Sequence, residues 1–277
     1  MRFALCNVVL GGMDFTAQST YAAAVGYDGL ELAPYTMGRE PHRLPAAERA
    51  RLRRVTADAG VAVTGLHWLL VTPAGLSITS ADPAVRARTV EVMRELVELC
   101  ADLGGRYLVH GSPAQRAVAD GDDLATALGR ACECWAAAAE AAGAAGLVYC
   151  IEPLGRQVTR LVNTVEEAAA VVREIGHPAL RAMVDTSAAA ATEAEPVPAI
   201  LDRWLPTGLI GHVQLNDRNR RAPGQGDDRF APVLAALLGH GYKGDVGVEP
   251  FEYHPSGPAA AARAIGYLRG ILEALHS

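Results

Sequence analysis

Short apolar runs alternate with longer segments of helical character along the chain. The apolar runs have the length and composition of buried β-strands: Phe3–Val9, Gly29–Ala33, Val61–Leu69, Tyr107–His110, Leu147–Glu152, Ala182–Asp185, Leu209–Leu215 and Asp245–Glu249. The intervening segments predict helices: Thr16–Val25, Pro45–Ala59, Pro83–Leu103, Asp122–Ala145, Val165–Ile175, Pro196–Leu205, Phe230–His240 and Pro258–Leu275. Helix signals agree, since Asp82-Pro83 is typical of a start and Gly60 and Gly104 of ends.

This alternation predicts the fold class. Near-continuous apolar strands indicate burial on both faces, which is typical of a parallel sheet. Eight strand–helix units without a low-complexity linker predict an α/β fold, a single (β/α)8 barrel spanning residues 1–277. A doubly wound open sheet is the alternative, but no GxGxxG motif follows the first strand, where Gly11-Gly12 indicates only a turn.

Composition narrows the classes of function. The chain of 277 residues is 50% hydrophobic, which excludes a disordered protein and suits one large domain. Its 25 Lys and Arg against 31 Asp and Glu leave a net charge of -6. That balance predicts no nucleic-acid or membrane partner, and an aromatic content of 5% argues against a base-stacking surface.

The cysteines and the N-terminal segment bear on location. Five scattered cysteines without a CxxC pair indicate neither a disulfide framework nor a zinc site. Met1–Leu10 lacks the features of a signal peptide, and no apolar run approaches the ~20 residues of a membrane span. We therefore expect a cytoplasmic protein.

Polar residues stand in or at the ends of most predicted strands: Glu31, His67, His110, Glu152, Asp185, Gln214 and Glu249. Enzymes built on (β/α)8 barrels carry their chemistry at the C-terminal ends of the strands. Because strand residues alternate between two faces, His212 and Gln214 share a face opposite Val213. The polar set can therefore point into the barrel.

Three carboxylates at one barrel mouth require a counter-charge, because buried like charges repel one another. A divalent cation supplies it, and hard oxygen ligands favour Mg²⁺ or Mn²⁺ over zinc, with Co²⁺ able to substitute. The alternative is that such carboxylates cap helices or pair with arginine. A polar residue on each of strands five to eight favours the metal site.

Four motifs resemble those of the xylose isomerase-like TIM barrel superfamily: Ile151-Glu152-Pro153, Met183-Val184-Asp185-Thr186, Gly211-His212-Val213-Gln214-Leu215-Asn216-Asp217 and Val248-Glu249-Pro250. The loop from Asn219 to Asp227 is similar to the family's PGxG loop after strand seven. The resemblance implies that one divalent metal is bound by four residues: Glu152, Asp185, Gln214 and Glu249.

The resemblance also implies an activity. Members include sugar isomerases, ketose 3-epimerases and hydroxypyruvate isomerases. Glu152 and Glu249 would act as acid and base on a metal-stabilised enediolate of a small sugar, ketose or hydroxy-keto acid. A homodimer is expected from the resemblance alone.

Some positions depart from the ketose epimerase pattern. Gln214 stands where many of these enzymes have histidine, and Ala188 and Val158 replace a substrate-binding His and Glu. These departures argue against a ketohexose 3-epimerase, although the metal chemistry is retained. Arg220 is kept and is expected to hold an anionic or polyhydroxylated substrate. Arg156 reads as a solvated loop residue rather than a carboxylate contact.

Other polar and aromatic residues are weaker candidates. His67 and His110 are predicted to contact substrate or donate protons, with a structural role as the alternative. His212 is expected one layer below the metal. Trp68 reads as core packing rather than a pocket wall, and Glu31 as an inward carboxylate paired with a core polar group.

Three other functions remain open at this level. A lyase or dehydratase, of the dehydroshikimate or inosose type, would use the same enolate with His67 or His110 as the general acid. A DNA-repair endonuclease of the same superfamily would use a zinc cluster, and the charge of -6 and Gln214 argue against it. A non-catalytic binding barrel does not need the paired Glu152 and Glu249.

Overall fold

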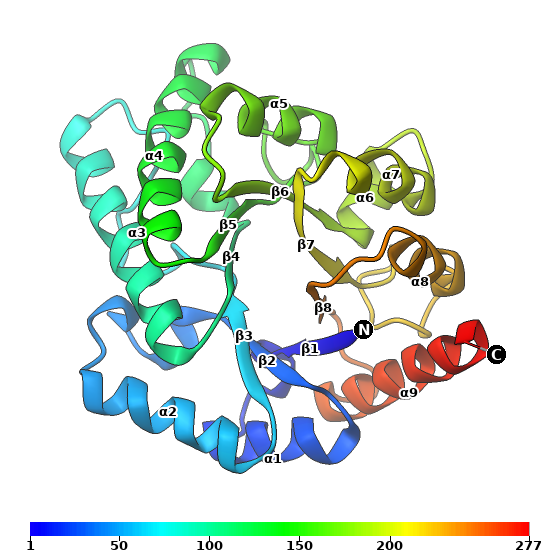
Figure 1. The fold of residues 1–277 in the computed structure, drawn as a ribbon. Helices are drawn as coiled ribbons and strands as arrows, with labels where there is room; N and C mark the ends of the chain where they lie inside the picture. The colour runs from blue at the N-terminus through cyan, green and yellow to red at the C-terminus, as the bar shows by residue number, and fades with distance from the viewer. Residues whose placement is uncertain (277) are drawn as a thin grey trace.

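A closed parallel barrel forms the centre of the molecule in the computed structural model, which describes residues 1–276 (Figure 1). Neighbouring strands pair in chain order, and β8 pairs with β1. The strands are β1 Arg2–Cys6, β2 Gly29–Leu32, β3 Ala62–Leu66, β4 Tyr107–His110, β5 Val148–Ile151, β6 Leu180–Asp185, β7 Ile210–Leu215 and β8 Asp245–Val248. The predicted (β/α)8 barrel is confirmed, and a doubly wound open sheet is excluded because it would leave two edges unpaired.

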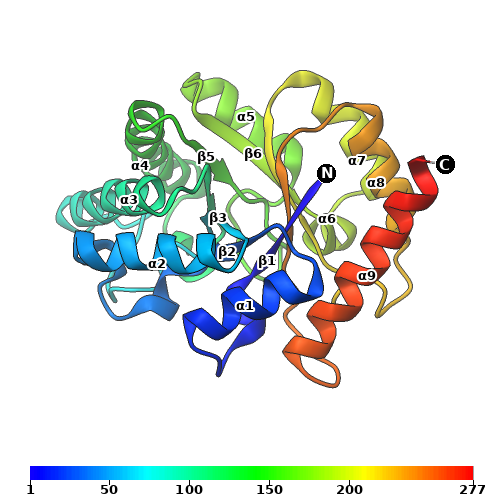
Figure 2. The ribbon, with the colours of Figure 1, turned by 60° about the horizontal axis from the view of Figure 1, so that its bottom comes forward.

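Helices surround the barrel as an outer ring (Figures 1 and 2). Their start and stop signals act as predicted: the Asp82 side chain accepts a hydrogen bond from the Ala84 backbone N–H, and Gly104 is left-handed at φ 86°. The helices are α1 Phe15–Val25, α2 Ala46–Asp58, α3 Pro83–Leu103, α4 Leu124–Ala144, α5 Val165–Ile175, α6 Thr186–Thr192, α7 Val197–Trp204, α8 Phe230–Gly239 and α9 Gly257–His276.

The structure differs from the predicted elements in two ways. The short helix α6 was not predicted; it begins directly after β6, where the Asp185 side chain accepts a hydrogen bond from the Ala188 backbone N–H at 2.7 Å. Strand β1 ends at Cys6 and continues as the one-turn 3-10 helix η1 (Asn7–Leu10). In both places a short helical segment follows the strand directly.

The apolar core occupies the layer between strands and helices. Its largest fully buried side chains include Trp135 of α4 and Phe230 of α8. Tyr107, Val109 and Met183 belong to a separate small cluster, because alternate strand residues face the barrel interior. Part of the barrel interior is therefore filled by these apolar side chains.

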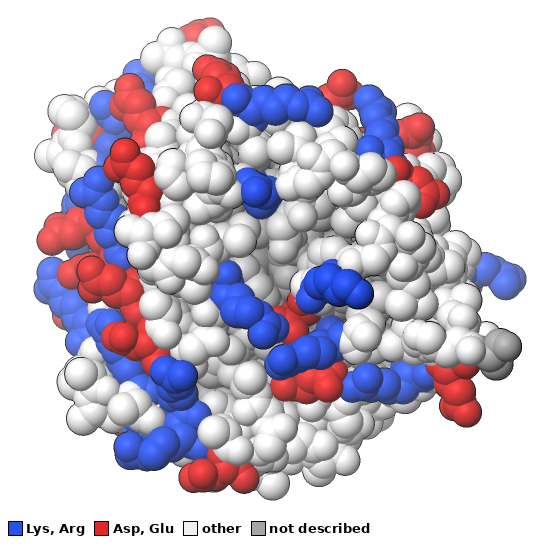
Figure 3. Space-filling view, viewed as in Figure 1, with Lys and Arg blue, Asp and Glu red and all other residues white. Residues whose placement is uncertain are grey.

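Charged side chains are interspersed on the face of the molecule shown in Figure 3.

Buried Asp245 at the start of β8 pairs with Arg2 at 3.3 Å and with Arg106, which precedes β4. These ion pairs join strands from three parts of the chain at the N-terminal end of the barrel. None of the helices within residues 1–276 combines the length and hydrophobicity needed to cross a membrane.

Candidate metal centre

Three buried carboxylates meet at the C-terminal end of the barrel. Glu152 follows β5, Asp185 ends β6 and Glu249 follows β8, and a ligand oxygen of each lies within 4.8 Å of the others. They lie in the wall of a cavity of about 240 Å³. The structure therefore brings together three of the four residues expected to bind metal from segments almost 100 residues apart.

The fourth expected ligand, Gln214, is the neighbour of Asp185 in the pairing of β6 with β7. Its Nε2 lies 2.6 Å from Glu31 Oε1. A carboxylate oxygen can only accept, so the amide NH₂ faces Glu31 and Oε1 is left without a hydrogen-bond partner. Asp185 Oδ2 is also buried without a partner. Two oxygen acceptors are thus available on adjacent strands.

The electrostatics of the cluster favour a bound cation. Burial raises the pKa of Glu152 well above its usual value, and the charges of Glu249 and Asp185 raise it further. Burial and then Glu249 raise the pKa of Asp185 to about 7. A divalent ion would offset this repulsion and take up the unpaired oxygens. The donor set, being all oxygen, fits a hard cation such as Mg²⁺ or Mn²⁺.

Glu249 is held by two consecutive residues. His67 Nδ1 donates to Glu249 Oε1 at 2.8 Å, and Trp68 Nε1 donates to the same oxygen at 2.9 Å. Trp68 has φ 52°, a left-handed conformation that is uncommon for a bulky residue and breaks the strand alternation. Trp68 borders the cavity, whereas His67 is not among the cavity-lining residues. Both side chains therefore orient the Glu249 carboxylate.

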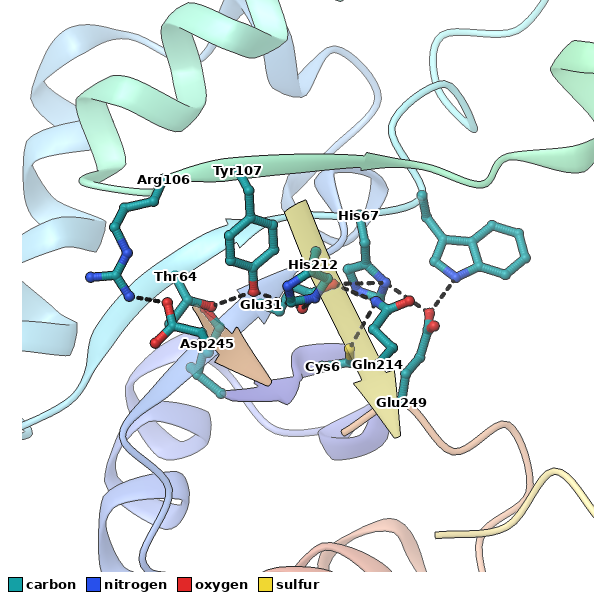
Figure 4. A network of polar contacts seen from close by, with 12 residues as sticks. Cys6, Glu31, Thr64, His67, Arg106, Tyr107, His212, Gln214, Asp245 and Glu249 are labelled. Carbon is teal, nitrogen blue, oxygen red and sulfur yellow. Dashed lines mark hydrogen bonds and ion pairs between the residues drawn. The ribbon is translucent and has the colours of Figure 1, made fainter. Parts of the chain in front are cut away.

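A network of hydrogen bonds in the barrel interior, centred on Glu31, leads to the site (Figure 4). Glu31 accepts from His212 Nε2 at 3.0 Å and from the Tyr107 hydroxyl at 2.8 Å, and the Tyr107 and His212 rings stack at 4.0 Å. Burial alone would raise the pKa of Glu31, but the charge and hydrogen bond of His212 lower it to about 2. Gly247 leaves room, since a Cβ there would lie 2.7 Å from Glu31 Oε2. Glu31 thus stays ionised and orients Gln214.

His110 lies outside the site. Strand β4 directs Tyr107 inward, so His110, three residues later, faces the helices. There His110 Nδ1 accepts hydrogen bonds from Tyr149 at 2.9 Å and from Trp135 Nε1 at 3.2 Å. Burial, followed by the charge of Arg116, lowers the pKa of His110 to about 3. The expectation that His110 contacts substrate does not fit this position.

The two arginines considered in the sequence take different places. Arg220 borders the cavity, with its guanidinium 5.1 Å from the centre of the Phe251 ring and its backbone at φ 67°. Arg156 is exposed and pairs with Glu167 at 3.4 Å. Of these two, only Arg220 is positioned to meet a bound molecule; Arg218 also borders the cavity.

Glycine is required beside Glu152. A Cβ at Gly111 would lie 1.9 Å from Glu152 Oε2, far inside contact distance. Gly111→Ala is therefore expected to displace the carboxylate and lower turnover about 10²-fold, as measured by the rate of substrate conversion. Gly129→Ala in α4 is the matched control, because nothing lies within 4 Å of its added Cβ. Equal activity of the Gly111 variant and the control would contradict this role of Gly111.

Several contributors to the site could not be identified from the sequence. The sequence predicts core packing for Trp68 and assigns no role to Gly111 or Arg116. Trp68 depends on a local left-handed turn, and Gly111 on the position of a side chain 41 residues further along the chain. No sequence pattern reports either feature.

Comparison with known proteins agrees with the barrel fold. The family model described as xylose isomerase-like TIM barrel matches residues 20–271. L-ribulose 3-epimerase from Mesorhizobium japonicum is 32% identical over 206 residues, which cover 72% of this chain and 65% of that enzyme. D-psicose 3-epimerase from Ruminiclostridium cellulolyticum is 32% identical over 113 residues, covering 41% of this chain and 38% of that enzyme.

Solved structures share the architecture over nearly the whole chain. A structure of L-ribulose 3-epimerase superposes with a TM-score of 0.84 at 24% identity, covering 99% of this chain and 95% of that one. This level of identity supports the fold alone. Because the family model spans most of the described barrel, the chain belongs to the xylose isomerase-like TIM barrel family.

Proposed function

We propose that this protein is a divalent-metal-dependent epimerase of a small ketose. The observation that carries the proposal is the convergence of Glu152 and Glu249 with Asp185 in the wall of one cavity. Strands β5 and β8 lie three places apart in the barrel, so the two glutamates approach the cavity from different sides. Two such carboxylates suit removal of a proton from one face of a carbon and its return on the other.

The two glutamates have different surroundings, which suits different roles. Glu249 accepts hydrogen bonds from His67 and Trp68, which fix the orientation of its carboxylate. Glu152 has a raised pKa and sits in the tight space beside Gly111. In one direction of the reaction Glu249 takes the proton and Glu152 returns one, and in the reverse direction the roles exchange.

Glu152, Asp185, Gln214 and Glu249 would hold the metal, with Mn²⁺ or Mg²⁺ as the expected ion and Co²⁺ as a substitute. When bound, the metal would polarise the substrate carbonyl and lower the pKa of the adjacent C–H. Because Glu31 accepts from the Gln214 amide NH₂, the Gln214 oxygen is directed away from Glu31. His67 and Trp68 keep Glu249 in place.

Substrate class follows from the relatives and from the cavity. The relatives are ketose 3-epimerases for L-ribulose and D-psicose, and the cavity of about 240 Å³ suits a small carbohydrate. Arg220 would bind its hydroxyl groups or a negative charge. Ala188 and Val158 form part of the wall, so hydroxyls beyond the reacting carbons meet apolar side chains there. The five free thiols suit a reducing cytoplasm.

A lyase reaction has less support. It needs a general acid at the leaving group, and the sequence offered His67 or His110 for that role. His110 faces the helix layer, and His67 uses Nδ1 to hold Glu249 without bordering the cavity. Neither histidine is therefore placed to protonate a leaving group in the cavity, whereas the carboxylates that would form an enolate are in place.

Incubation of metal-loaded protein with L-ribulose or D-psicose in D₂O tests the proposal. One deuterium is expected at C3 of the epimeric ketose, because the proton is exchanged with solvent-derived deuterium during inversion. Mass spectrometry and NMR of the product measure this incorporation. An unsaturated product, or no exchange with any ketose in the presence of metal, would overturn the assignment.

A further inference from the structure

Arg116 is a fully buried arginine beside the candidate metal centre, in the one-turn 3-10 helix η4 (Pro113–Arg116) after β4. Among the described residues, no carboxylate lies within ion-pair distance of it. Its contacts are backbone carbonyls: Nη1 donates to the Glu152 carbonyl at 2.7 Å and Nη2 to the Val162 carbonyl at 3.4 Å. A buried guanidinium without a paired carboxylate is unfavourable for stability, which argues that its position serves another purpose.

The two carbonyls mark the two ends of one loop, residues 153–161. Four residues of this loop line the cavity: Leu154, Gly155, Gln157 and Val158. Arg116 therefore joins Glu152, which precedes the loop, to Val162, which follows it. Through η4 it also ties the loop to the segment after β4, where Gly111 and Pro113 line the cavity.

Backbone strain at Val162 supports this role. Val162 has φ 58°, and a β-branched residue in the left-handed region is a marked outlier. Its carbonyl accepts from Arg116 and from the Leu154 backbone N–H at 3.2 Å. Such strain persists only where surrounding contacts enforce it. The contacts that enforce it here include the Arg116 guanidinium.

Arg116 also acts on Glu152 through its charge. Burial lowers the pKa of Arg116 and the charge of Glu152 opposes that shift, so the guanidinium stays protonated at neutral pH. In turn the positive charge limits the rise in the pKa of Glu152. The same side chain thus fixes the backbone of Glu152 and partly neutralises its carboxylate.

We propose that Arg116 is a positioning residue that sets the place of Glu152 and holds the 153–161 loop against the cavity. The part concerning turnover rests on the proposed function, whereas the part concerning the loop does not. The two parts can therefore be tested separately.

Trypsin reports on the loop without any substrate, because the loop carries exposed Arg156 and Arg160. Loss of hydrogen bonds from a charged donor is expected to raise native-state cleavage at these sites about ten- to a hundredfold in Arg116→Met and Arg116→Ala. Added guanidinium chloride, well below denaturing concentrations, should slow cleavage of Arg116→Ala again by refilling the vacated space. Sodium chloride at equal ionic strength should not.

Arg130→Ala is the matched control. Arg130 also bridges separate segments, through the Thr79 carbonyl at 3.2 Å and Asp122 at 2.5 Å, and it does not line the cavity. Its loss should leave cleavage at Arg156 and Arg160 unchanged. If both Arg116 variants fail to fold, Arg116→Lys keeps the charge but lacks the fork that spans two carbonyls, and faster cleavage is still expected.

Steady-state kinetics address the positioning of Glu152. Arg116→Met is expected to lower kcat about 10²-fold with a smaller change in KM, because Glu152 is displaced after substrate has bound. Guanidinium should restore part of kcat in Arg116→Ala and nothing in Arg130→Ala. Folded Arg116 variants with wild-type cleavage and wild-type kcat would overturn the proposal. A wild-type enzyme without ketose activity contradicts the proposed function, and the protease result still decides the role in the loop.

Discussion

Glu152→Gln and Glu249→Gln are each expected to lower epimerisation about 10²- to 10⁴-fold, the range for loss of a general acid or base. The substitution keeps the shape of the side chain and removes the group that carries the proton. Each variant should keep its fold, because a neutral side chain in this buried cluster relieves repulsion between like charges. Deuterium exchange at the reacting carbon, followed by NMR, measures the effect.

The two variants also distinguish one base from two. If the glutamates serve opposite faces, each single variant that still binds metal retains exchange of the epimer whose C–H faces the remaining glutamate. The other epimer loses exchange. Equal exchange of both epimers by one variant would contradict the two-glutamate mechanism. Glu166→Gln, at an exposed site on α5, is the control and should behave as wild type.

Removal of a divalent metal with EDTA is expected to abolish activity, and Mn²⁺, Mg²⁺ or Co²⁺ to restore it. Metal is also expected to stabilise the fold, because it would bind the native cluster and offset its charges. At a free metal concentration of ~100 times Kd, binding adds about 2.7 kcal/mol, which for a domain of this size raises Tm by about 5–10 °C. Thermal melting with and without metal measures this shift.

Protons compete with the metal for the carboxylates, and the raised pKa values determine in which direction metal affinity changes with pH. Without metal, Asp185 has a pKa of about 7 and Glu152 lies well above its usual value. Metal binding therefore releases protons, and its affinity falls as the pH drops below about 7. Calorimetric titration in two buffers of different ionisation enthalpy measures the released protons. Undiminished turnover by metal-free protein, or no change in Tm on adding metal, would contradict the assignment.

The positions of individual side chains separate what was predictable from what was not. Alternation of faces within β7 correctly placed His212 and Gln214 inside the barrel, because β7 pairs regularly with β6 from His212 to Gln214, after a register shift at the start of the strand. In β4 the same alternation places Tyr107 inward and His110 toward the helices, away from the cavity. At β3 the strand ends before His67, and the left-handed Trp68 brings two consecutive side chains to one carboxylate.

Asp185 shows that two interpretations of one residue can hold together. The alternative to a metal ligand was a helix cap, and Asp185 Oδ1 does accept the Ala188 backbone N–H of α6. Its Oδ2 nevertheless stays buried without a partner, facing the other carboxylates. The sequence identifies the residue, but only the structure shows that one oxygen caps the helix while the other is free to bind a metal.

By itself the sequence determined the barrel and placed carboxylate and amide side chains at the ends of its strands, because hydrophobic period and strand-end position are local properties of the chain. Tertiary structure decided the rest. It selected which strand-end side chains face the cavity, directed the Gln214 oxygen by placing Glu31 behind its amide, and brought Arg116 to the two ends of the 153–161 loop. These features depend on positive φ angles and on contacts between segments far apart in the chain, and neither leaves a periodic trace in the sequence.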